Sequence, residues 1–163
     1  SANRPVFNEK TVKALLFLAL WAVIGVNTYS AYDALKSIGA VDNRRSAEWL
    51  KSNSREGDRV FITNYGSFPQ LFFYNRVNVY TFGFDPIFLY DFDNMKYFRY
   101  QAALMLKTDP YPVISDLFQA DYIHIENIPQ SARFYDYLAG HPDYYTKKYQ
   151  DDFSAVFKVL GKE

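Results

Sequence analysis

Three carboxylates, Asp85, Asp91 and Asp93, lie within nine residues of one another near the middle of the chain. Oxygen ligands of this kind can hold a divalent cation, although their spacing is not that of a calcium-binding loop. A simpler interpretation gives each residue a local role, because Asp readily caps helices and initiates turns. Asp93 would then cap a helix, Asp85 would form a turn with Pro86, and Asp91 would be solvated.

The stretch around these carboxylates, from Asn64 to Asp93, is dense in Phe and Tyr and is interleaved with amides and carboxylates. Sugar rings have apolar faces and hydroxyl rims, so an aromatic wall beside a few placed polar groups is typical of a carbohydrate site. The alternative is that these rings form the core. The stretch is therefore the first candidate for a ligand site, and the rest of the chain is expected to position it.

Composition and motifs exclude most kinds of enzyme site. The 163 residues include no cysteine, which excludes a disulfide framework and a thiolate nucleophile. Eighteen basic and eighteen acidic residues give zero net charge, so we expect no nucleic-acid partner. The motifs G-x-G-x-x-G, G-x-x-x-x-G-K-[ST], G-x-S-x-G and H-E-x-x-H are missing, so we expect no cofactor in this chain. His124 and His141 lie far apart, and His124 is expected to be a core or interface residue rather than a metal ligand.

A hydrophobic segment from Ala14 to Tyr32 contains no charged residue. As a helix, its 19 residues would span about 28 Å, close to the thickness of the hydrocarbon core of a bilayer. Lys10 and Lys13 precede it and mark its N-terminal side as cytoplasmic by the positive-inside rule. We therefore expect a membrane segment in residues 1–36 and an extracytoplasmic domain in residues 37–163. A buried helix of a soluble protein and a cleaved signal peptide are the alternatives.

The remaining sequence alternates between strand and helix patterns. The expected strands are Arg59–Asn64, Val77–Phe82, Tyr122–Asn127, Tyr144–Tyr149 and Phe153–Leu160. The first three are expected to be parallel neighbours joined by right-handed crossovers. The last two should form an antiparallel hairpin, with Lys147 and Lys148 on an exposed edge. The predicted fold is a three-layer, Rossmann-like α/β domain with a mostly parallel sheet, preceded by the long hydrophobic helix.

Helices are predicted from capping residues and apolar spacing. Asp42 or Asn43 can cap a helix that ends before Gly57, and Ser67 with Gln70 matches a capping box for a helix over Phe68–Tyr74. Asp109-Pro110 opens a helix with Val113, Ile114, Leu117 and Phe118 on its buried side, and a further short helix is expected over Gln130–Leu138. Asp93 can cap a helix whose inward face would carry Met95, Phe98, Ala102 and Met105.

A series of short motifs follows one another in a specific order along most of the chain. They are FPQLFFYN (68–75), Tyr80, GFDP (83–86), FLY (88–90), Asp93, Asp109-Pro110, Val113-Ile114, FQADY (118–122) and a closing run over 149–159. Their order resembles the C-terminal extracytoplasmic domain of polytopic membrane proteins of the GT-C glycosyltransferase type. The resemblance covers the chain from about Ala47 to Val159, and the preceding hydrophobic helix fits the last membrane span of such a protein.

Members of that superfamily transfer a sugar from a polyprenyl-phosphate carrier, so the resemblance implies a cell-membrane glycosyltransferase with further membrane helices upstream. The family's catalytic acidic residues lie in an early extracytoplasmic loop that this chain does not contain. No catalytic residue is therefore carried over, and any divalent cation would belong to the full-length protein. The favoured function is a non-catalytic domain that helps to bind a glycan acceptor or a polyprenyl-phosphate-sugar donor. The alternatives are a structural or interaction domain without a ligand and an independent soluble enzyme, which the missing motifs disfavour.

In open α/β sheets, ligands bind beyond the carboxyl ends of the strands. The ligand-binding residues expected at this edge are Asn64, Tyr65, Asp85, Tyr90, Asp91 and Glu126. The loop over residues 84–93 would fold over the edge from the second strand, with Tyr90 as a stacking wall and Asp85 or Asp91 as acceptors for sugar hydroxyls.

Overall fold

The computed structural model describes residues 8–38, 42–83 and 85–161. The chain divides into an N-terminal unit, residues 1–40, and an α/β unit, residues 41–163. The elements in chain order are α1 (Glu9–Ile38), α2 (Arg44–Asn53), β1 (Arg59–Ile62), η1 (Tyr65–Ser67), α3 (Phe68–Tyr74), β2 (Val79–Tyr80), α4 (Ile87–Phe92), α5 (Asn94–Leu104), α6 (Pro110–Pro112), η2 (Val113–Leu117), β3 (Tyr122–Glu126), η3 (Pro129–Ser131), α7 (Ala132–Gly140), β4 (Tyr145–Gln150) and β5 (Ser154–Val159).

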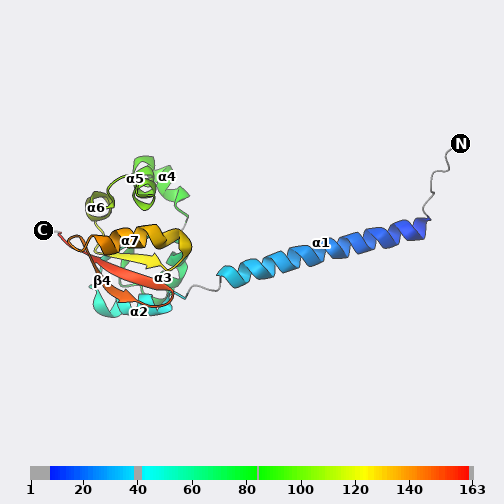
Figure 1. The fold of residues 1–163 in the computed structure, drawn as a ribbon, viewed down its shortest axis with the longest axis horizontal. Coiled ribbons are helices and arrows are strands. Elements are labelled where there is room, and N and C mark those ends of the chain that lie inside the picture. The colour runs from blue at the N-terminus through cyan, green and yellow to red at the C-terminus, as the bar shows by residue number, and fades with distance from the viewer. Residues whose placement is uncertain (1–7, 39–41, 84, 162–163) are drawn as a thin grey trace. The chain divides into compact units, whose positions relative to one another are not determined.

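Helix α1 is one uninterrupted helix of 30 residues (Figure 1). Its segment Lys10–Asp33 is long and apolar enough to cross a membrane, by length and composition, and none of that segment is buried. Large side chains such as Leu16, Trp21 and Val26 are exposed along it. The predicted continuous helix over Ala14–Tyr32 is therefore confirmed, and it extends further at both ends.

The α/β unit contains a five-stranded sheet in the order β2-β1-β3-β5-β4. Strand β1 pairs in parallel with both β2 and β3, whereas β5 is antiparallel to both β3 and β4. Four of the five strands therefore run in one direction, and only β5 runs against them. The predicted parallel neighbours and the terminal hairpin are confirmed, and β4 is an edge strand on which Lys147 and Lys148 are exposed.

Strand β2 is shorter than the predicted Val77–Phe82, although its pairing with β1 continues past its ends. The amide of Gly57 donates to the carbonyl of Val77 over 2.9 Å, and the amide of Thr81 donates to the carbonyl of Val60 over 3.0 Å. Its neighbour Asn78 is buried and bonds through its side chain to Ser54. These hydrogen bonds hold the edge strand β2 against β1, although only Val79 and Tyr80 of the described residues are assigned to the strand itself.

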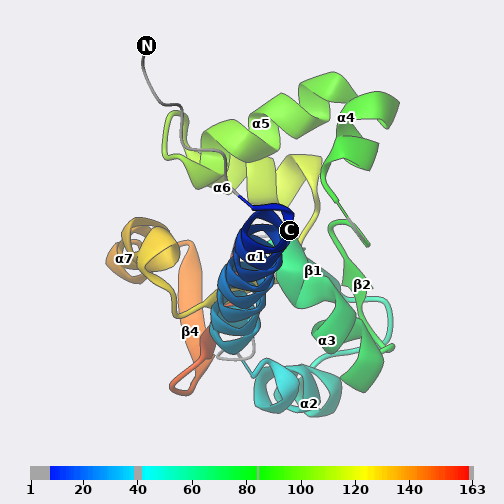
Figure 2. The same cartoon turned by 90° about the vertical axis from the view of Figure 1, so that its right-hand side faces the viewer.

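Helices cover both faces of the sheet, as Figure 2 shows for α2 and α3 on one side and α5 and α6 on the other. The strands alternate accordingly, because successive side chains of a strand point to opposite faces. One face carries Val60, Ile62, Tyr122 and Val156, which pack with Ala47 and Leu50 of α2 and Leu71 of α3. The other face carries Phe61, Ile123, Ile125 and Phe157, which pack with residues of α5, η2 and α7.

Helix α5 is oriented differently from the prediction. Asp93 is its N-cap, as expected, and accepts a hydrogen bond from the amide of Lys96 over 2.9 Å. Its buried residues, however, are Tyr100 and Ala103. Met95, Phe98 and Met105 are exposed by 61%, 55% and 55%, so the prediction that this apolar face packs inward is wrong. Tyr100 takes the inward position because its ring fits against β1 and its hydroxyl finds a partner there.

Tyr100 joins α5 to the carboxyl end of β1. Its ring lies 5.3 Å from that of Phe61 and 4.9 Å from that of Phe82, between centroids, and its hydroxyl donates to the carbonyl of Ile62 over 3.1 Å. Burial of this hydroxyl raises its pKa above the ordinary value.

We expect Tyr100→Phe to lower the free energy of unfolding by about 1 kcal/mol, because it removes one buried hydrogen bond and the carbonyl of Ile62 loses that donor. Urea denaturation of the full chain in lipid nanodiscs measures this change. Tyr65→Phe, at an exposed tyrosine, is the matched control and should be neutral. An equal effect of the two substitutions would contradict a specific role for the Tyr100 hydroxyl.

Candidate functional site

A buried carboxylate, Glu126, lies at the carboxyl end of the central strand β3 and is only 5% exposed. Its Oε1 accepts hydrogen bonds from Asn43 Nδ2 over 2.8 Å and from Ser67 Oγ over 2.7 Å. Its Oε2 accepts from Asn64 Nδ2 over 2.6 Å. All three donors are neutral. A buried carboxylate requires such donors, because its desolvation would otherwise be very costly.

Three separate elements deliver these donors to Glu126. Asn43 precedes α2, Asn64 follows β1, and Ser67 ends η1. The Oδ1 atom of Asn64 accepts from the amide of Gly66 over 3.0 Å, which fixes the orientation of the Asn64 amide toward the carboxylate. The NH₂ group and the carbonyl oxygen of the Asn64 side chain are therefore both hydrogen-bonded.

The predicted capping box of Ser67 and Gln70 is wrong, although the helix α3 that it predicted is present. Ser67 makes no capping bond, because its hydroxyl donates to Glu126 instead. The side chain of Gln70 accepts from the backbone amide of Asn43 over 2.9 Å. The two residues thus fasten the start of α2 to the carboxyl edge of the sheet.

His124, two residues before Glu126 on β3, is completely buried. Its Nε2 lies 3.1 Å from Ser46 Oγ, and that hydroxyl also lies 2.9 Å from the carbonyl of Asn43, to which it donates. We therefore assign the imidazole proton to Nε2, with Nδ1 as a buried acceptor that has no hydrogen-bond partner among the described residues. Burial lowers the pKa of His124 to about 4, against the opposing effect of Glu126 and Asp151. The prediction that His124 is a core residue is confirmed.

A pocket of about 230 Å³ lies where the chain leaves β3 and enters α7. Its lining includes the apolar residues Ile125, Ile128, Ala132, Tyr135 and Ala155 and the polar residues Glu126, Asn127, Ser131, Asp136, Gln150 and Ser154. The hydroxyl of Tyr135 donates to Gln150 Oε1 over 3.0 Å, and Lys147 Nζ donates to the same oxygen over 2.6 Å. An apolar wall with a polar rim of this kind can hold one face of a sugar ring.

A second pocket of about 390 Å³ lies toward the amino ends of β1 and β3, and charged residues line it, including Arg55, Asp58, Asp121 and Lys158. Ligand sites of open α/β sheets lie at the carboxyl edge. The pocket beside Glu126, which we call the α7 pocket, is therefore the stronger candidate.

The structure brings only two of the six predicted ligand-binding residues into contact, Asn64 and Glu126. Tyr65 is exposed on η1 next to Asn64. Asp85 accepts from the amide of Ile87 over 2.9 Å, which is the turn that the simpler interpretation gives it. Tyr90 contacts the rings of Tyr97 and Phe98 edge-on, and Asp91 is exposed. Phe84, where the predicted aromatic loop begins, lies outside the described residues.

Sequence reasoning missed the residues that complete the site. Asn43 and Ser67 bond to a carboxylate that lies 83 and 59 positions away in the sequence, respectively. Ser131, Asp136 and Gln150 line a pocket that exists only because α7 packs on the sheet. The polar segment after β3 could have indicated this pocket from the sequence. Ligands of open α/β sheets bind beyond the carboxyl ends of the strands, and that segment follows the carboxyl end of β3.

Within the described residues, no group of three or more His, Asp or Glu side chains is arranged to hold a metal ion. No protein-family model, curated protein or solved structure matches the chain. Its function is therefore inferred from the geometry of the chain itself.

Proposed function

We propose that the chain is the membrane-anchored, non-catalytic end of a GT-C type glycosyltransferase, and that its α/β unit holds a glycan close to the membrane surface. The glycosyltransferase assignment rests on the order of the sequence motifs, and one observation carries the placement of the glycan. The chain enters the α/β unit at Asn43, whose side chain bonds to Glu126 at the carboxyl edge of the sheet. The α7 pocket includes Glu126, so the entry point and the candidate ligand site share one edge.

The length of the connection supports a site near the membrane. Helix α1 ends at Ile38, and Asn43 follows five residues later. Five extended residues span at most about 18 Å, and the six helical residues from Asp33 to Ile38 add about 9 Å. If α1 spans the bilayer up to Tyr32, Asn43 therefore lies within roughly 27 Å of the membrane boundary. Lys10 and Lys13 on the other side of α1 favour an extracytoplasmic α/β unit.

The polar groups of the α7 pocket suit a neutral glycan better than a phosphate. Its lining includes the carboxylates of Glu126 and Asp136, and Lys147 Nζ bonds to two lining side chains, Tyr135 and Gln150. Carboxylates accept hydrogen bonds from sugar hydroxyls, and two carboxylates outweigh the one ammonium group in their effect on an anionic polyprenyl phosphate. A volume of about 230 Å³ is also below the range of typical drug-sized sites, which suits a single sugar residue.

For the architecture, we propose a three-layer, Rossmann-like arrangement. The parallel strands β2, β1 and β3 with helices on both faces support it, while the antiparallel β5 distinguishes it from a wholly parallel sheet. A purely structural or interaction domain is the second candidate. The observation in its favour is that the carboxylate of Glu126 is already satisfied by three donors of the same chain.

Filling the α7 pocket tests glycan binding. Ala132 is an exposed alanine that lines the pocket, and Ala139 is an exposed alanine on the same helix outside it. We expect Ala132→Trp to weaken the binding of short neutral oligosaccharides at least about tenfold, which corresponds to about 1.4 kcal/mol, whereas Ala139→Trp leaves it unchanged. Saturation-transfer NMR on the full chain in lipid nanodiscs measures this binding.

Two further variants separate the α7 pocket from the site first expected at α4. Asp85→Asn and Tyr90→Ala should leave oligosaccharide binding intact if the α7 pocket is the site. Binding that survives Ala132→Trp but is lost in these two variants would move the site to α4. No detectable binding of any oligosaccharide to the unmodified chain would favour the structural domain without a ligand.

A further inference from the structure

Helix α5 is apolar on two opposite sides. Tyr100 and Ala103 pack into the core, while Met95, Phe98 and Met105 point away from it and are more than half exposed. A surface helix normally has one apolar stripe and a polar opposite face. The outer stripe of α5 is therefore left largely uncovered by the described residues of the chain.

Helix α4 enlarges this surface. None of its residues is buried, Phe88 is 66% exposed, and Phe92 is 90% exposed. The ring of Tyr90 contacts the rings of Tyr97 and Phe98 at centroid distances of 5.5 and 5.7 Å, which packs α4 against α5. We call the exposed apolar residues of the two helices the α4–α5 surface and define it as Ile87, Phe88, Tyr90, Phe92, Met95 and Phe98. Exposed apolar side chains gathered in this way mark sites that contact a protein or a membrane.

The position of α4 favours the membrane. The connection to α4 leaves the parallel strand β2 at its carboxyl end and reaches α4 at Ile87. Asn43, where the chain arrives from α1, bonds to Glu126 at the carboxyl end of β3. Parallel strands end at the same edge of the sheet, so α4 and the entry point of the tether lie on the same side of the α/β unit.

The chemistry of the surface fits the interfacial layer of a bilayer. Phe, Tyr, Ile and Met have the apolar and amphipathic side chains that insert among head groups and upper acyl chains. The neighbouring charges leave a net charge of −1 over residues 85–99, because Asp85, Asp91 and Asp93 outnumber Lys96 and Arg99 by one. Binding would thus depend on apolar insertion and not on anionic lipids.

We propose that the α4–α5 surface inserts into the outer interfacial layer of the bilayer that α1 spans. The inference rests on the membrane anchoring in the proposed function. Anchoring at both α1 and α4 would restrict rotation of the α/β unit and hold the α7 pocket at a defined orientation to the membrane.

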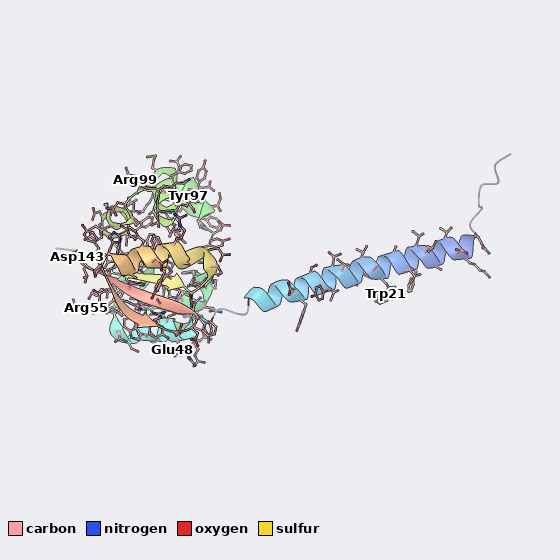
Figure 3. The ribbon with its side chains drawn as sticks, viewed as in Figure 1. Trp21, Glu48, Arg55, Tyr97, Arg99 and Asp143 are labelled. Carbon is pink, nitrogen blue, oxygen red and sulfur yellow. The ribbon has the colours of Figure 1, made fainter. Side chains whose placement is uncertain are left out.

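The natural lack of cysteine allows a single spin label to be placed at any position. Nitroxide labels at Met95→Cys, Val23→Cys and Asp143→Cys report on α5, on the middle of α1 and on the start of the β4 hairpin. Asp143 is exposed and precedes the amino end of β4, at the sheet edge opposite Glu126; Figure 3 shows it apart from Tyr97 and Arg99 of α5. The full chain is reconstituted in phosphatidylcholine vesicles, and collisions with oxygen and with a water-soluble nickel complex are measured by electron paramagnetic resonance.

We expect the nickel complex to reach the Met95 label at least about threefold less than the Asp143 label, with oxygen access close to that at Val23. In the Met95→Cys background, Phe88→Ser with Phe92→Ser should raise nickel access to the Asp143 level. Phe72→Ser with Phe73→Ser, at two exposed phenylalanines of α3, is the matched control and should leave the Met95 label protected.

Three outcomes overturn the proposal. A Met95 label in water with a Val23 label in lipid would show that anchoring holds and insertion does not occur, while water access at both labels would contradict the anchoring in the proposed function as well. Spin–spin broadening at the Met95 label that disappears on dilution with unlabelled chain would identify the surface as a contact between two copies.

Discussion

Glu126→Gln is expected to lower the free energy of unfolding of the α/β unit by about 2 kcal/mol. The substitution keeps the shape of the side chain but replaces one acceptor oxygen with an NH₂ donor. That donor would face either Asn64 Nδ2, or Asn43 Nδ2 with Ser67 Oγ. On the second side the Ser67 hydroxyl can turn to accept, and a flip of the Asn43 amide can present its Oδ1, which has no partner among the described residues. The remaining loss is the negative charge on the acceptor together with about one unpaired donor. Each buried donor left without an acceptor costs about 1–3 kcal/mol.

A flip of the Asn64 amide cannot relieve the conflict without a new loss. Its Oδ1 already accepts from the amide of Gly66, so turning that oxygen toward the NH₂ group introduced by the substitution would leave the Gly66 amide unpaired. Replacing Glu126 with Ala should cost more than replacing it with Gln, about 4 kcal/mol, because all three donors lose their acceptor and a cavity is added.

Urea denaturation of the full chain in nanodiscs, followed by the fluorescence of Trp49, measures these losses. Trp49 packs against Tyr122 and Tyr149 on the α2 side of the sheet and reports on this unit when Trp21 of α1 is replaced by Phe. Glu48→Gln is the matched control, because Glu48 is half exposed and pairs with Arg44 on the surface. We expect the control to change stability by less than about 0.5 kcal/mol. A Glu126→Gln variant as stable as the control would show that the carboxylate is not the centre of the polar cluster.

The strands could be predicted from the sequence because their physical signal is local. The β-branched and aromatic runs of β1 and β3 are bounded by polar residues, and the short link between β4 and β5 allows only a hairpin. The parallel pairing of β1 with β2 and β3 followed from the intervening helices. The terminal strand β5 lies inside the sheet between β3 and β4, an order that the local pattern could not give.

The orientation of α5 shows where periodicity fails. Two sets of residues in α5 and at its end follow helical spacing. One set is Met95, Phe98 and Met105, and the other is Tyr100 with Ala103. The pattern alone therefore cannot say which set faces the core. The structure places the larger aromatic Tyr100 inward, where its hydroxyl reaches the carbonyl of Ile62. The sequence interpretation assigned the side of Met95, Phe98 and Met105 to the core. The structure leaves that side exposed, which indicates a second contact surface on the helix.

The candidate site was predicted only at its centre. Asn64 and Glu126 end neighbouring parallel strands, so the carboxyl-edge rule brings them together. Ser67 matched a local capping pattern, but a hydroxyl bonds more strongly to a carboxylate than to a neutral amide, and it turned to Glu126. The hydrogen bond of Ser67 was therefore determined by Glu126, a partner that is distant in the sequence, and not by the local capping pattern.

Lowering the pH from 6.5 to 4 is expected to remove about 3 kcal/mol of stability through His124 alone. Burial lowers the pKa of His124 to about 4 in the folded chain, whereas an unfolded chain has a His pKa near 6.5. The unfolded state therefore binds more protons than the folded state between these two values. Stability contributed by the neutral imidazole is complete above about pH 6.5, decreases as the pH falls, and is lost once the pH has passed through about 4.

The groups around His124 determine how far this loss extends. Ser46 of α2 contacts Nε2, and the carboxylates of Glu126 and Asp151 favour the charged imidazole and partly oppose the effect of burial. Removing the charge at Glu126 should therefore lower the pKa of His124 further. Glu126→Gln is expected to make the loss of stability between pH 6.5 and 4 larger than in the unmodified chain.

His124→Gln isolates the contribution of His124 from that of the carboxylates that also titrate in acid. Glutamine can place an amide nitrogen close to Ser46 Oγ but does not titrate in this range. Urea denaturation at several values between pH 7 and pH 4 should give a curve for the variant that is flatter by about 1.4 kcal/mol per pH unit in the middle of the range. His141→Gln is the matched control, because His141 is partly exposed and stacks on Tyr137 at 4.2 Å. Parallel curves for the unmodified chain and His124→Gln would mean that His124 is protonated as easily in the folded chain as in the unfolded one.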